Sequence, residues 1–144
     1  MTASKAKTAA RRRRSALGRV LLAEDDAVLA LALEDALLRG GASAVVICSS
    51  MAATVRALDD GQPFDAVVLD VHLADRDDGW AVAELIALLG PKRPRIAFST
   101  GSPQDIPELV AEMGPVFEKP YDPEQLVEVL VAGRRRGLIA RLLG

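Results

Sequence analysis

Acidic, hydroxyl and amino side chains recur in this sequence where short apolar segments end. Glu24, Asp25 and Asp26 follow the first segment, Asp70 ends the third, Thr100 ends the fourth, and Lys119 follows the fifth. Clustered carboxylate oxygens suit a hard divalent cation, and a site that has few carboxylates and keeps waters suits Mg²⁺ better than Ca²⁺. Lys119 would add a second positive centre, and Thr100 a hydrogen-bond donor. Together these groups favour phosphoryl transfer, which depends mainly on positioning and charge stabilisation.

Each acid taken alone has a simpler interpretation as a helix cap or a solvated charge. Asp26 directly precedes a helical pattern, so we expect it to cap that helix. The specific signal is the combination in chain order: an acidic cluster first, then Asp70, Thr100 and a Lys-Pro pair.

The segments that carry these residues predict five strands alternating with helices. Strands are expected at 19–24, 43–48, 65–70, 95–100 and 115–118, and helices at 27–39, 51–60, 79–89 and from Asp122 to a stop at Gly133. Runs such as AVVIC and AVVLD are typical of strands buried on both faces, which favours a parallel sheet covered by helices. We therefore expect an α/β fold with a doubly wound, five-stranded parallel sheet and helices on both faces. In such a sheet the functional groups gather at the carboxyl ends of the strands.

Length and charge suggest one domain with basic ends. The chain has 144 residues, and no apolar run approaches the roughly 20 residues needed to span a bilayer. All 20 acids fall between residues 20 and 132, where seven Lys and Arg leave a formal charge of −13. Residues 1–18 resemble a transit peptide in composition, but we expect a disordered basic tail and a cytoplasmic protein. Residues 133–144 form a basic, amphipathic extension.

Several kinds of site have no support in the sequence. There is no glycine-rich phosphate loop, no paired Cys or His metal spacing and no Ser-His-Asp set. The single cysteine, Cys48, cannot form an internal disulfide and is expected to be a small buried apolar residue.

Four segments, VLLAEDD, DAVVLDVHLADRDDGW, RIAFSTG and FEKPYDPEQL, resemble the signature regions of the response-regulator receiver (CheY-like) family over residues 19–132. The resemblance implies a flavodoxin-like strand order of 2-1-3-4-5. It implies that Glu24 and Asp25 form an acidic pocket, that Asp70 accepts the phosphoryl group, that Thr100 is the switch hydroxyl and that Lys119 pairs with the phosphate. It also implies a cis Lys119-Pro120 bond and Mg²⁺ bound by Glu24, Asp25, Asp70 and the backbone carbonyl of His72.

Three positions depart from the family pattern. Val116 stands where Tyr or Phe is usual in the family, and it has no aromatic ring that could move together with the threonine. Ala74 replaces a common proline, and Gly101 replaces a common alanine before a short, proline-broken fourth helix. The run FSTGS is similar to the FATG motif of a subgroup of stand-alone receivers that work with histidine kinases.

By this resemblance, we expect a phosphorylation-dependent switch rather than an enzyme that acts on other molecules. Its donor would be a sensor histidine kinase or a histidine phosphotransfer protein, and its output a downstream protein or a homodimer. An alternative is a Mg²⁺-dependent phosphatase of the haloacid-dehalogenase type, but that class needs an Asp where this chain has His72. A second alternative is nucleic-acid binding through the basic ends, which we do not expect because the acidic body would be repelled.

Overall fold

Five parallel strands form one sheet in the computed structural model, which describes residues 17–73, 86 and 93–143. The strands are β1 (Gly18–Ala23), β2 (Ala42–Cys48), β3 (Ala66–Asp70), β4 (Arg95–Thr100) and β5 (Val116–Glu118). Their order in the sheet is β2-β1-β3-β4-β5, and every pairing is parallel. The expected strands, order and fold class are confirmed, with shifts of one residue at some strand ends.

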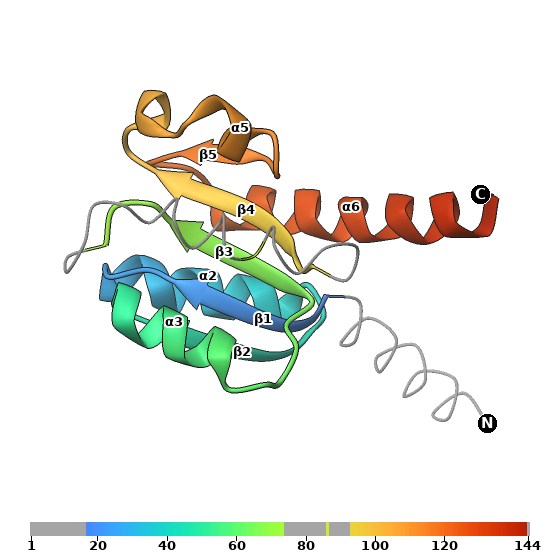
Figure 1. Ribbon diagram of the computed structural model, residues 1–144, viewed down its shortest axis with the longest axis horizontal. Coiled ribbons are helices and arrows are strands. Elements are labelled where there is room, and N and C mark those ends of the chain that lie inside the picture. Colours follow the sequence, from blue (N-terminus) through green and yellow to red (C-terminus); the bar gives the residue numbers. More distant parts are fainter. Residues whose placement is uncertain (1–16, 74–85, 87–92, 144) are drawn as a thin grey trace.

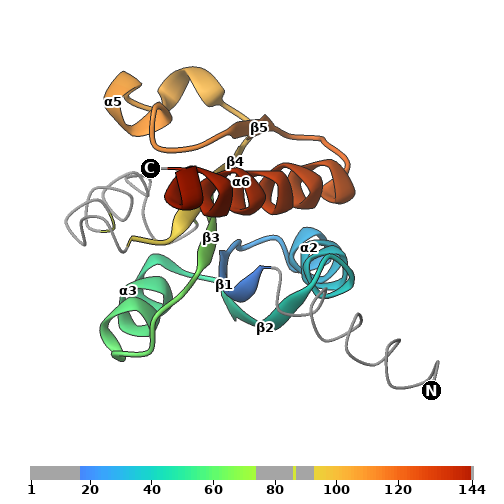
Figure 2. The same ribbon diagram turned by 90° about the vertical axis from the view of Figure 1, so that its right-hand side faces the viewer.

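Helices cover both faces of this sheet. Those described are α2 (Ala27–Arg39), α3 (Met51–Asp59), the 3-10 turn η2 (Pro103–Asp105), α5 (Glu108–Ala111) and α6 (Pro123–Leu143). α2 and α6 lie on one face and α3 on the other (Figure 1, Figure 2). The helix expected at 79–89 lies outside the described residues except for Ile86, which is helical and buried.

The two faces of the sheet build two apolar cores. Successive side chains of a strand point to opposite faces, and β1 supplies both cores in this way. Leu21 packs on the α3 side with Met51 and Phe98. Leu22 packs on the other side with Leu33 of α2. Because β1 is buried on both faces, its carboxyl end is held firmly.

Side-chain caps fix where the helices begin. Asp26 Oδ1 accepts hydrogen bonds from the backbone N–H groups of Val28 (2.9 Å) and Leu29 (3.1 Å) at the start of α2. Asp122 Oδ1 accepts one from Glu124 (3.0 Å) at the start of α6. The capping role expected of Asp26 is confirmed, and Asp122 plays the same part where the last helix was expected to start.

The predicted helix end at Gly133 is wrong. α6 continues through Gly133 to Leu143, and its second half extends past the end of the sheet (Figure 1). A glycine ends a helix when it adopts a left-handed conformation, and Gly133 is not among the described residues with positive φ. Inside a helix a glycine only weakens it, by about 1 kcal/mol relative to alanine.

The segment after β4 forms a short helix, as expected. It consists of η2 and the four-residue α5, which lie at the β5 edge of the sheet (Figure 1). Pro103 begins η2, and Pro107 precedes α5. Proline lacks the backbone donor that a helix interior requires, so the two turns do not merge.

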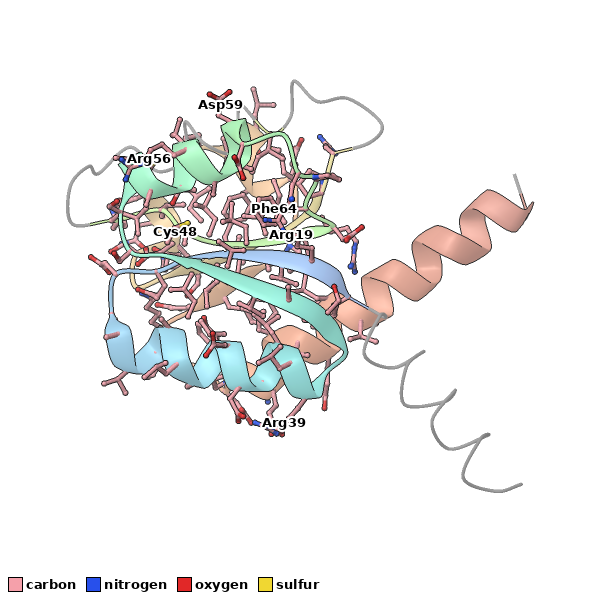
Figure 3. All side chains as sticks on the ribbon, turned by 90° about the horizontal axis from the view of Figure 1, so that it is seen from below. Arg19, Arg39, Cys48, Arg56, Asp59 and Phe64 are labelled. Atoms are coloured by element: carbon pink, nitrogen blue, oxygen red, sulfur yellow. The ribbon has the colours of Figure 1, made fainter. Side chains whose placement is uncertain are left out.

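The amino-terminal end of β1 is tied to the segment before β3. Arg19 donates its backbone N–H to Asp65 Oδ2 (2.8 Å), and its guanidinium lies 4.2 Å from the ring centre of Phe64 (Figure 3). Gly18 precedes it with a φ of +68°, a conformation that glycine adopts without strain. Arg19 therefore belongs to the folded body and not to a free basic arm.

Candidate functional site

Three acidic side chains converge at the carboxyl ends of β1 and β3. The two strands are neighbours in the sheet, with Ala23 opposite Leu69, so Glu24 and Asp70 leave them side by side. One carboxylate oxygen from each of Glu24, Asp25 and Asp70 lies within 4.8 Å of the other two. Glu24 and Asp70 are buried, whereas Asp25 is exposed.

Glu24 is a buried carboxylate that is only partly satisfied. Its side chain is 1% exposed, and Oε2 accepts a hydrogen bond from the backbone N–H of Asp26 (3.0 Å). Oε1 lies 2.7 Å from Lys119 Nζ, an ion pair whose geometry is not that of a hydrogen bond. Burial raises the pKa of Glu24 to about 7; the Lys119 ammonium and the Asp26 amide oppose this, and the Asp70 charge adds to it.

Asp70 is held from two directions. Asp70 is 3% exposed. Its Oδ1 accepts a hydrogen bond from the backbone N–H of His72 (2.9 Å), and its Oδ2 accepts one from Lys119 Nζ (3.0 Å). Burial alone would lower the pKa of Lys119, but the close contacts and charges of Glu24 and Asp70 outweigh it and raise the pKa above its ordinary value. Lys119 therefore stays protonated, and its ammonium group contacts two buried carboxylates.

Thr100 and Lys119 are linked through the backbone. Lys119 donates its N–H to the carbonyl of Thr100 (2.8 Å), and the expected cis Lys119-Pro120 bond is present. Thr100 is fully buried, and its Oγ1 accepts a hydrogen bond from the N–H of Ser102 (3.0 Å). That bond uses the hydroxyl as an acceptor, so its own proton is left for an acceptor in the site.

His72 contributes its backbone to the site. Its N–H binds Asp70, while the imidazole Nε2 lies 3.4 Å from Asp105 Oδ2 in η2. The imidazole therefore faces the segment after β4. The role of the His72 carbonyl as a metal ligand stays a prediction.

The donor set fits a hard divalent cation. Carboxylates about 4 Å apart repel by roughly 4 kcal/mol per pair at an effective dielectric near 20, and one Lys119 cannot neutralise three of them. Glu24 Oε1 is buried without a hydrogen-bond partner, and the exposed Asp25 keeps the cluster open to water. Oxygen ligands with room for waters are what Mg²⁺ requires.

Among the departures from the family pattern, Val116 is 36% exposed on β5, and Gly101 has open space where a side chain would be. Ala74 lies outside the described residues. Cys48 is buried at the end of β2, and burial raises the pKa of its thiol, as expected for an inert cysteine.

One polar pair near the site was not predicted from the sequence. Ser99 Oγ and the hydroxyl of Tyr121 lie 2.6 Å apart. Ser99 appears in the sequence as one residue of an apolar strand, and Tyr121 as one residue of the turn before α6. No pattern in either segment indicates that they meet.

The sequence profile of the response regulator receiver domain matches residues 20–131, the part of the chain that forms the sheet and this site. The chain belongs to this family. Receiver domains act in phosphorylation-dependent two-component signalling. The search of curated proteins gave no significant match.

Solved structures have the same fold as this receiver domain. The CheY-like receiver domain from Methylobacillus flagellatus is 22% identical with a TM-score of 0.70, over 82% of this chain and 98% of that one. A Burkholderia pseudomallei response regulator, solved with a phosphorylated aspartic acid, a calcium ion and citrate, is 22% identical with a TM-score of 0.66, over 88% and 74%. The response regulator DrrB of Thermotoga maritima is 23% identical with a TM-score of 0.68, over 84% of this chain and 54% of its own length.

Proposed function

We propose that this receiver domain accepts a phosphoryl group on Asp70, with Mg²⁺ bound by Glu24, Asp25, Asp70 and the carbonyl of His72. The observation that carries the proposal is the placement of Asp70. Its carboxylate is buried, lies among the acidic cluster, and accepts a hydrogen bond from the ammonium of Lys119. Phosphoryl transfer depends mainly on positioning and on charge stabilisation, and a fixed carboxylate beside an ammonium group and a cluster of metal-binding oxygens supplies both.

In the proposed step, a carboxylate oxygen of Asp70 attacks phosphorus. The new O–P bond forms as the bond from phosphorus to the donor breaks, and the donor group leaves with the electron pair. Lys119 offsets the added negative charge, and the Thr100 hydroxyl, which accepts a hydrogen bond from Ser102, donates its own hydrogen bond to a phosphoryl oxygen. When bound, Mg²⁺ supplies further charge neutralisation of the phosphoryl oxygens.

A structural neighbour supports this chemistry. The Burkholderia pseudomallei response regulator carries a phosphorylated aspartic acid and a calcium ion on the same fold. By analogy we propose a divalent cation and an aspartyl phosphate for this chain as well, because its own acidic cluster offers carboxylate oxygens at the carboxyl ends of β1 and β3.

We further propose that the donor is a sensor histidine kinase or a histidine phosphotransfer protein and that output occurs through a downstream protein or a homodimer. The receiver body would be 19–132, flanked by the basic tail 1–18 and the extension 133–144. Among the residues that the structure describes, no helix is long and apolar enough to cross a membrane.

Two other functions are less well supported. A haloacid-dehalogenase phosphatase would need an Asp at position 72, and here His72 turns its imidazole toward Asp105. Nucleic-acid binding would use the basic residues at the ends of the chain, seven of which lie among residues 1–19. One of these, Arg19, contacts Asp65 and Phe64 and so belongs to the folded body and not to a basic arm. We retain neither function.

The decisive experiment is incubation with acetyl phosphate and Mg²⁺ followed by intact mass measurement. We expect one phosphoryl group on the wild type and none on Asp70→Asn, because an amide cannot serve as the attacking carboxylate. Asp65→Asn is the matched control, since Asp65 lies at the opposite end of β3 and should leave labelling intact. Undiminished labelling of Asp70→Asn would disprove the proposal.

The extension can be tested separately. Four apolar residues, Leu138, Ile139, Leu142 and Leu143, fall at helical spacing in it. We propose that residues 134–144 contribute to a dimer or partner contact. Their deletion should weaken self-association in sedimentation while leaving the labelling of Asp70 unchanged. An unchanged sedimentation profile and unchanged partner binding would remove that role.

A further inference from the structure

Ser99 and Tyr121 form a hydroxyl pair beside the site. Ser99 lies on β4, is 1% exposed, and is the residue before Thr100. Tyr121 is half-buried and lies two residues after Lys119. Their hydroxyl oxygens are 2.6 Å apart, a short O–H···O hydrogen bond.

The segment that carries Lys119 has few other attachments. β5 is an edge strand of three residues, paired only with β4, and its residues are largely exposed. An edge strand this short offers few ladder hydrogen bonds to hold the chain that follows it. Lys119 nevertheless has to reach across the sheet to both Glu24 and Asp70.

Two hydrogen bonds pin this segment to β4 on either side of the lysine side chain. The backbone N–H of Lys119 binds the carbonyl of Thr100, and the hydroxyl of Tyr121 binds Ser99, the preceding residue of the same strand. The Tyr121 ring also packs on Phe117, with 5.6 Å between ring centres. We propose that Tyr121 and Ser99 are positioning residues that hold Lys119 over the two carboxylates.

The hydroxyl of Tyr121 is the specific element of this arrangement. A phenylalanine would fill nearly the same volume and keep the packing on Phe117. Without the hydroxyl, Ser99 would lose its partner at a buried site, an arrangement that proteins avoid. The Tyr121 side chain therefore makes two contacts next to the site: its ring packs on Phe117, and its hydroxyl forms a hydrogen bond with Ser99.

The inference rests on the proposed function, because its readout is the phosphorylation of Asp70. The rate constant of labelling by acetyl phosphate is measured at saturating Mg²⁺ for Tyr121→Phe, Ser99→Ala and Ser99→Thr. We expect the first two to be slower by about tenfold, because small misplacement of a charged group is costly in transfer reactions. Ser99→Thr keeps a hydroxyl and should restore most of the rate. Ser43→Ala, at an exposed site of β2, is the matched control and should label normally.

A second arm separates positioning from simple structural damage. In a Lys119→Ala background, Tyr121→Phe should cause no further slowing, because the residue acts through the lysine. Melting curves establish whether each variant is folded at the assay temperature. If Ser99→Ala is unfolded there, the labelling rates of Tyr121→Phe and Ser99→Thr test the inference.

The outcomes distinguish this inference from the proposed function. Wild-type rates in Tyr121→Phe and Ser99→Ala, with labelling still lost in Asp70→Asn, would overturn the positioning role alone. The positioning role would also be overturned if Tyr121→Phe slowed labelling by the same factor in the Lys119→Ala background as in the wild type. Absence of any labelling in the wild type would overturn the proposed function, and the positioning role with it.

Discussion

Lys119 Nζ lies 2.7 Å from Glu24 Oε1, although Glu24 follows β1 and Lys119 follows β5, with β3 and β4 between them in the sheet. The lysine side chain therefore crosses the carboxyl edge of the sheet, and Asp70 at the end of β3 lies along its path at 3.0 Å. One cation thus links the ends of three strands.

Lys119→Met should destabilise the protein in the absence of Mg²⁺. The substitution leaves Glu24 and Asp70 buried without their shared cation, and breaking such a pair on one side costs about 3 kcal/mol or somewhat less where water reaches the site. Urea unfolding at pH 8 measures the loss. Added Mg²⁺ should recover part of it, because the metal supplies the missing charge. Arg56→Met, at an exposed site of α3, is the control.

Glu24 predicts a defined dependence of stability on pH in the metal-free protein. Its pKa is about 7 when folded, against an ordinary value of 4.5. Between these values the unfolded chain has released the proton and the folded protein keeps it. The free energy of unfolding should therefore fall as pH rises from 4.5 to 7, by up to about 3 kcal/mol.

The comparison of wild type with Glu24→Gln isolates this contribution. The glutamine variant cannot titrate, so the difference between the two unfolding free energies should change through that pH window and become constant above it. Curves that run parallel from pH 4.5 to 8 in the presence of a chelator would show that Glu24 ionises normally.

Asp25 and Asp26 are adjacent acids with different expected roles. Asp25→Ala should weaken Mg²⁺ binding by about tenfold or more while leaving the melting temperature of the metal-free protein unchanged or higher, since a clustered carboxylate is removed. Asp26→Ala should keep Mg²⁺ affinity but lose about 1 kcal/mol of stability with the cap of α2. Calorimetric titration and thermal melting of both variants test the pair. Equal effects on metal affinity would contradict the assignment.

Two glycines near β4 should respond oppositely to alanine. At Gly114 a Cβ would come 1.9 Å from the backbone oxygen of Ile96, so Gly114→Ala should cost about 1 to 3 kcal/mol. At Gly101 nothing lies within 4 Å of the added carbon, so Gly101→Ala should be neutral or stabilising by up to about 1 kcal/mol. The urea unfolding midpoints of the two variants test this prediction. If Gly114→Ala unfolds at the wild-type midpoint, the backbone at Gly114 can move away from the backbone at Ile96.

The sequence alone determined the elements and the order in which the charged residues meet. Continuous aliphatic runs predict buried parallel strands, and a parallel sheet brings the carboxyl ends of its strands to one edge. The strand pattern is therefore enough to place Asp70, Lys119 and the acidic cluster together. Asp26 was readable as a cap because capping is a local interaction between neighbouring residues.

Only the tertiary structure decided the features that depend on distant packing. Gly133 looked like a helix end from its local chemistry, yet α6 continues through it, because a glycine stops a helix only when its backbone turns left-handed. The pairing of Ser99 with Tyr121 and the pKa of Glu24 depend on burial and on partners up to 95 residues away in the chain. Sequence patterns report periodicity and local propensity, whereas these properties arise from which side chains the folded sheet brings into contact and removes from water.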